Sequence, residues 1–190
     1  MRTRFLALVS CTTLLAAPLP RTARAQDAVS AATVTEVRKQ FLVDLDTLQS
    51  KVLALANAFP EEKYAWRPVA GVRSVSEVLM HVASEYYVFS PQAYNATVSP
   101  RIGRGQEAFQ KFEKITGKAN VVAELKESFD YMKKSVGAVD AASLAGTPKI
   151  FGGPRTIVSS SNIMIADLHE HLGQLIAYAR MNGVTPPWSK

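Results

Sequence analysis

The sequence has little cysteine, little histidine and few aromatic residues. One cysteine, Cys11, and three histidines occur in 190 residues, and Phe, Trp and Tyr together make up 8%. A single cysteine forms no intrachain disulfide and no multi-thiolate metal site. Strand patterns are weak throughout, and neither an internal repeat nor a low-complexity tract is present. What the sequence does contain is a distinctive N-terminus and several long stretches with helical periodicity.

Residues 1–25 have the pattern of a secretory signal. Arginines precede an apolar run, and Ala23-Arg24-Ala25 supplies a small-residue cleavage site. The run is too short, and too interrupted by prolines, to span a membrane, and no later segment is long enough to do so. We therefore expect export to the periplasm or the exterior, no membrane span, and a single mature domain over residues 26–190.

The excess positive charge belongs largely to this signal. The formal net charge falls from +6 to +2 when the four arginines of residues 1–25 are removed, because that segment holds no acidic residue. The remaining chain shows no basic stripe with interleaved aromatic residues, so nucleic acid is not an expected partner. Cleavage would also remove Cys11 and leave the mature chain without a cysteine nucleophile or thiolate ligand.

Four long helical patterns predict an all-α four-helix bundle. Their apolar residues recur at helical spacing over residues 34–59, 75–93, 121–139 and 157–182. Thr33 with Glu36, and Ser74 with Glu77, have the spacing of capping boxes. The connections are long, and one of them carries a predicted helical turn near residues 106–115. Connections of this length often cover a functional site.

The stretch "DLHEHLGQLIAY", residues 167–178, gathers two histidines and two carboxylates into five positions. On a helical wheel Asp167 and His171 lie one above the other, because residues four apart share a face. Gln174 and Tyr178 continue this line along one flank of the apolar arc. His169 lies on the opposite flank and is predicted to be a surface residue.

The third histidine, His81, lies on the flank of the apolar arc of residues 75–93, with Glu77 and Glu85 beside it. Flank positions of neighbouring helices can converge, and bundles build metal sites from such positions. The alternative is structural: each histidine is satisfied by a carbonyl or a carboxylate, and Asp167 with His171 forms an ordinary helix ion pair. Spacing alone favours this alternative.

Three segments resemble the DinB/YfiT-like family of metalloenzymes. "WRPVAGVRSVSEVLMHVA", residues 66–83, resembles the family's tryptophan–arginine–proline turn and the helix that bears its first metal histidine. "DLHEHLGQLIAYARMNGVTPPW" resembles its last helix, which supplies two further ligands, and "KANVVAELKESFDYM" resembles its third. The resemblance implies a four-helix bundle and a metal site formed by His81, Asp167 and His171.

Two positions depart from the family pattern. Asp167 stands where the middle histidine is usual, and Leu172 stands where an arginine is usual. Two imidazoles and one carboxylate still make a three-ligand set with open positions, suited to Zn²⁺, Ni²⁺, Fe²⁺ or Mn²⁺.

Two kinds of function follow from this ligand set. The first is a metal-dependent hydrolase or transferase acting on an unknown small molecule, because a bound ion can lower the pKa of water to ~7. Glu85 or Glu170 is then the candidate base. Thiol-dependent transfer, found in some relatives, fits an exported chain poorly because the necessary thiols are kept in the cytosol. The second is a non-catalytic bundle whose active site has lapsed and which binds a metal or a small molecule. A homodimer is a further candidate state.

Overall fold

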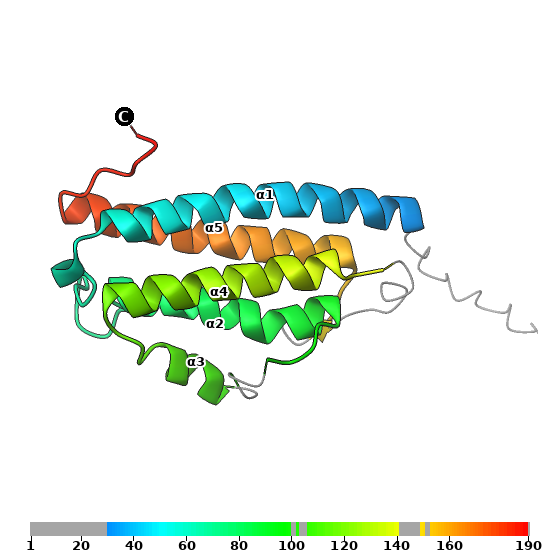
Figure 1. The fold of residues 1–190 in the computed structure, drawn as a ribbon, viewed down its shortest axis with the longest axis horizontal. Helices are drawn as coiled ribbons and strands as arrows, with labels where there is room; N and C mark the ends of the chain where they lie inside the picture. The colour runs from blue at the N-terminus through cyan, green and yellow to red at the C-terminus, as the bar shows by residue number, and fades with distance from the viewer. Residues whose placement is uncertain (1–29, 100–101, 103–105, 141–148, 151–152, 190) are drawn as a thin grey trace, which may run out of the picture.

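Four long helices form the body of the molecule in the computed structural model (Figure 1). The structure describes residues 30–99, 102, 106–140, 149–150 and 153–189. The long helices are α1 (Ala31–Ala58), α2 (Val75–Tyr94), α4 (Lys118–Gly137) and α5 (Ile157–Met181). The prediction of an all-α four-helix bundle is confirmed. The predicted signal, residues 1–25, lies outside the described residues.

The described parts of the connections carry four short elements. These are the 3-10 helix η1 (Glu61–Lys63), the helix α3 (Gln106–Phe112) and an antiparallel pair of two-residue strands, β1 (Lys149–Ile150) and β2 (Gly153–Pro154). The helical turn predicted near residues 106–115 therefore corresponds to α3. Within the part of the chain that is described, no helix is both long enough and apolar enough to cross a membrane.

α2 and α4 run in the same direction along the bundle (Figure 1). Both begin at the end where α1 finishes; the Lys118 ammonium, at the start of α4, donates to the carbonyls of Asn57 and Phe59 at 2.8 and 2.7 Å. The chain that leaves α2 must therefore travel back along the bundle before α4 can start. The helix α3 lies on this return path and packs against the outside of α2.

The start of α2 and the end of α5 follow the predicted capping chemistry. The Ser74 hydroxyl accepts the Glu77 N–H at 3.3 Å, and the Glu77 carboxylate accepts the Ser74 N–H at 2.6 Å, which completes the predicted capping box. Beyond α5, Gly183 has a φ of 71°, the left-handed conformation expected just after a helix.

Two other helix starts differ from the prediction. α1 begins at Ala31, because Ser30 rather than Thr33 is its N-cap and accepts the Thr33 N–H at 3.1 Å. α4 begins at Lys118, three residues before the predicted start at residue 121, and directly follows Gly117, whose φ of 82° suits glycine. In both cases a second residue that can start a helix lies three positions upstream of the predicted one.

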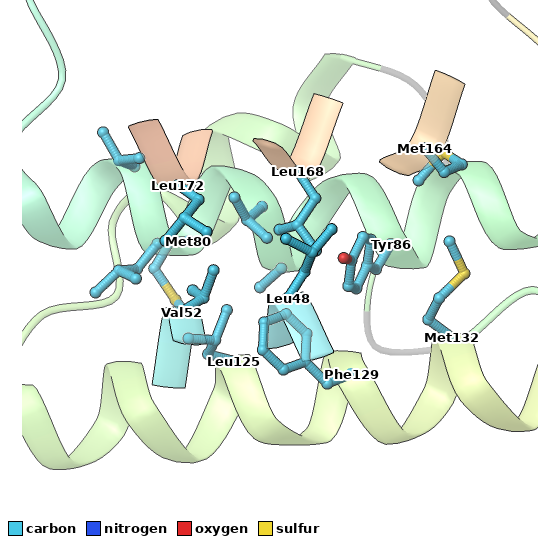
Figure 2. Close-up of a cluster of buried hydrophobic side chains, with 14 of the residues drawn as sticks. Leu48, Val52, Met80, Tyr86, Leu125, Phe129, Met132, Met164, Leu168 and Leu172 are labelled. Atoms are coloured by element: carbon cyan, nitrogen blue, oxygen red, sulfur yellow. The ribbon is translucent and has the colours of Figure 1, made fainter. Parts of the chain in front are cut away.

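A single apolar core fills the space between the four long helices (Figure 2). Side chains of all four contribute, and each of those labelled in Figure 2 is at most 5% exposed: Leu48, Val52, Met80, Tyr86, Leu125, Phe129, Met132, Met164, Leu168 and Leu172. Because the apolar arcs of α2 and α5 face this core, the polar flanks of the two helices are left to meet each other beside it.

Candidate metal centre

His81 of α2 and His171 of α5 meet where these two helices pack together. Their rings are edge to face, with centroids 5.2 Å apart and planes at 82°. The Glu85 carboxylate lies between them, with Oε1 3.1 Å from the Nε2 atom of His81 and Oε2 3.4 Å from that of His171. One ligand atom from each residue lies within 4.8 Å of the other two, so these three residues could hold a metal ion.

Helical periodicity explains why α2 supplies two members of this group. His81 and Glu85 are four residues apart and therefore share one face of the helix. Their neighbours Val78, Leu79 and Val82 point into the core and fix the rotation of the helix. With that rotation fixed, the flank that carries the imidazole and the carboxylate is turned toward α5.

The other predicted site residues differ in how close they lie to this group. Asp167 lies beside the group, with Oδ1 3.9 Å from the Nε2 atom of His171 and within hydrogen-bonding reach of Glu85. His169 is exposed, as the wheel predicts, and Glu170 is exposed as well. The carboxylate between the two histidines is thus Glu85, which was considered as a base, and not Asp167, which was predicted as a ligand.

The carboxyl groups of Glu85 and Asp167 have pKa values shifted in opposite directions. Burial disfavours the charged form of Glu85, but hydrogen bonds from His171 and His81 outweigh it and lower the pKa of Glu85 to about 2. Burial, together with the negative charge of Glu85, raises the pKa of Asp167 to about 7. Burial also opposes protonation of His171, but its contact with Glu85 prevails and raises the pKa of His171. At neutral pH Glu85 is therefore an anion, and its negative charge favours the protonated forms of Asp167 and His171.

Two polar atoms of this group are buried without a hydrogen-bond partner of good geometry. They are Oε2 of Glu85 and Nδ1 of His81. Leaving a buried carboxylate oxygen unsatisfied is costly, and a cation shared with the neighbouring imidazoles would satisfy it. Two imidazoles and one carboxylate are also a usual donor set for divalent first-row metals. The residues present therefore fit a divalent ion.

A chain of hydrogen bonds orients His171 from behind. Its Nδ1 lies 3.4 Å from the side-chain oxygen of Gln174, whose amide nitrogen donates to the Tyr178 hydroxyl at 3.0 Å. That hydroxyl donates to the Arg73 carbonyl at 3.0 Å, and the Trp66 ring packs edge-on against the Tyr178 ring. The polar line predicted along α5 thus keeps the Nε2 atom of His171 turned toward the group.

A family profile described as the DinB superfamily matches residues 44–175. The chain belongs to the DinB superfamily. The match begins within α1, ends within α5 and includes all three members of the group around Glu85. No curated protein matches the chain in a sequence comparison. The predicted family is confirmed, and in this DinB chain the candidate metal centre is formed by two histidines and a glutamate.

Proposed function

We propose that this DinB superfamily chain binds one divalent first-row metal ion through His81, Glu85 and His171. The observation that carries the proposal is the position of the Glu85 carboxylate, buried between two imidazoles with Oε2 lacking a hydrogen-bond partner of good geometry. The mature chain offers no thiolate, so Zn²⁺, Ni²⁺, Fe²⁺ and Mn²⁺ suit the donor set better than copper(I) or an iron–sulfur cluster.

The proposed activity is metal-dependent hydrolysis or group transfer on a small molecule. Three protein ligands leave coordination positions open, and a bound ion would supply Lewis acidity there. The imidazoles of His81 and His171 keep 15% and 11% of their surface exposed, so the group is reachable from solvent. Asp167 lies outside the ligand set, with Oδ1 3.9 Å from the Nε2 atom of His171, and is our candidate for exchanging a proton with a bound substrate. A purely metal-binding role without turnover is the alternative.

Metal content tests the proposal directly. The untagged wild-type chain should carry stoichiometric metal by elemental analysis, and His81→Ala and His171→Ala should each abolish it because a ligand is lost. His169→Ala is the matched control, since His169 is exposed and lies outside the group. Wild-type protein without stoichiometric metal, or metal retained in both ligand variants, would contradict the assignment.

The same protein should lose metal in mild acid. Both histidines must give up their protons to coordinate an ion, and the raised pKa of His171 makes protons compete at a higher pH than for an ordinary histidine. The apparent affinity should therefore fall as the pH drops from 8 toward ~6. An affinity that is constant over this range would contradict coordination by imidazole.

A further inference from the structure

The return path between α2 and α4 places one more carboxylate against the metal centre. Glu113, directly after α3, has Oε1 3.2 Å from the Nδ1 atom of His81. The same oxygen accepts the Arg73 Nε–H at 2.8 Å. The Phe109 ring of α3 packs against the His81 ring, with centroids 5.6 Å apart. His81 is thus in contact with α3 and with the residue that directly follows it.

Coordination of an ion by His81 would require an acceptor for its Nδ1 proton, and the contact with Glu113 supplies one. The Nε2 atom of His81 faces Glu85, so an ion in the group takes Nε2 and leaves the proton on Nδ1. That Nδ1 atom is buried and has no hydrogen-bond partner of good geometry among the described residues. A buried N–H without an acceptor is unfavourable, and the Glu113 carboxylate is already within hydrogen-bonding distance.

Glu113 does not share the ion in this arrangement. Nδ1 and Nε2 point away from each other across the imidazole ring, so a carboxylate beside Nδ1 lies on the far side of the ring from the ion. The three residues whose ligand atoms cluster are His81, Glu85 and His171, without Glu113. The function left to Glu113 is that of an acceptor behind the ligand.

We propose that Glu113, held in place by Arg73, is a positioning residue of the metal centre. It accepts the Nδ1 proton of His81 and so fixes the ring with Nε2 toward the ion. This inference rests on the proposed metal site and adds to it a residue from the connection between α2 and α4. Carboxylate–histidine–metal contacts of this kind orient the ring and increase the basicity of the ligand.

Arg73 links the orientation of both histidines. Its guanidinium holds Glu113 against His81, while its backbone carbonyl accepts the Tyr178 hydroxyl that leads through Gln174 to His171. One residue in the turn before α2 thus restrains the Nδ1 side of each imidazole. Both Nε2 atoms are left facing Glu85.

Zinc affinity, measured by competition with a chromophoric chelator, tests the proposal. Glu113→Ala should weaken Zn²⁺ binding about 10–100-fold, the usual effect of losing an outer partner of a ligand. Glu113→Gln keeps an acceptor oxygen and should restore part of the affinity. Glu107→Ala, at an exposed carboxylate of the short helix that precedes Glu113, is the matched control. Equal affinities for Glu113→Ala and Glu107→Ala would overturn the proposal.

A second measurement separates this inference from the metal site itself. In the metal-free protein, the side-chain ¹⁵N resonance of His81 Nδ1 should shift in Glu113→Ala and stay unchanged in Glu107→Ala, with His169 as internal reference. Wild-type protein that binds no Zn²⁺, Ni²⁺, Fe²⁺ or Mn²⁺ would refute the proposed function, whereas this spectrum still reports on Glu113. An unchanged His81 resonance in Glu113→Ala would refute the positioning role.

Discussion

Glu85 is a carboxylate buried between two helices, and it remains ionised because two imidazoles hydrogen-bond to it. Its pKa is about 2 even though burial alone would raise it. A buried anion needs positive partners, and here these are either protons on the neighbouring side chains or a metal ion. Removing the carboxylate therefore affects ion binding more directly than removing any residue at the edge of the group.

Comparison of three variants identifies the carboxylate ligand. Glu85→Gln should reduce metal affinity by more than the roughly 10–100-fold typical of an outer contact, because a charged ligand is lost. Asp167→Asn should have a smaller effect, since Asp167 lies 3.9 Å from His171 and outside the ligand group. His169→Ala should have none. Isothermal titration with Zn²⁺ gives the three affinities.

A larger loss in Asp167→Asn than in Glu85→Gln would instead support the ligand set implied by the family resemblance. Equal losses would mean that both carboxylates bind the ion. Thermal melts of the metal-free variants serve as the control for folding, because a variant that unfolds loses metal for an unrelated reason.

The histidines of the site could be predicted from sequence, but the choice of carboxylate could not. A helical wheel gives the angle of a residue around its own helix, and this correctly turned His169 away from His171. It does not give distances across a helix pair, and these depend on how deeply α2 and α5 pack. Glu85 and Asp167 both lie on helix flanks that face the two histidines. Only the packed structure shows that Glu85 lies between the imidazoles.

At the scale of elements, the helices were predictable in number and extent because their apolar residues recur at helical spacing. The starts of α1 and α4 were less predictable, since Ser30 and Gly117 start these helices three residues before the predicted positions. Glu113 could not be found from sequence, because it follows a short helix in a connection and gains its role only by contact with His81.

The capping box of α2 should make stability depend on pH. Burial opposes ionisation of Glu77, but hydrogen bonds from Ser74 and Arg67 prevail and lower its pKa below 4.5. A lowered folded-state pKa gives stability that is complete above the unfolded-state pKa and is lost as the pH falls through the folded-state value. Glu77→Gln should therefore be less stable than wild type at pH 7, with the difference shrinking below pH ~4.

Chemical denaturation with chelator present, at pH 7 and pH 3.5, measures this difference. Glu62→Gln, at an exposed position in η1, is the control and should show little change at either pH. Ser74→Ala should cost ~1 kcal/mol, the usual effect of losing an N-cap side chain. A Glu77→Gln difference that is as large at pH 3.5 as at pH 7 would contradict an electrostatic origin.

At the scale of the whole molecule, the predicted export signal and the described bundle are separate parts of the chain. The bundle has its own core, which is formed by residues between Phe41 and Ala179. We predict that the exported chain begins at or near Gln26, because the small-residue site ends at Ala25. N-terminal sequencing of protein recovered outside the cytoplasm checks this, and a recovered chain that retains residues 1–25 would contradict it.

The ligands are distributed along the chain in a way that bears on when and where the ion is acquired. His81 and Glu85 belong to α2, whereas His171 belongs to the last helix, so the ligand set is complete only after α5 has packed onto α2. Metal binding at the proposed site would therefore be coupled to formation of the whole bundle. A chain that crosses a membrane unfolded would take its ion from the compartment in which it folds, and the metal supply of that compartment, as much as the donor atoms, would select which ion is bound.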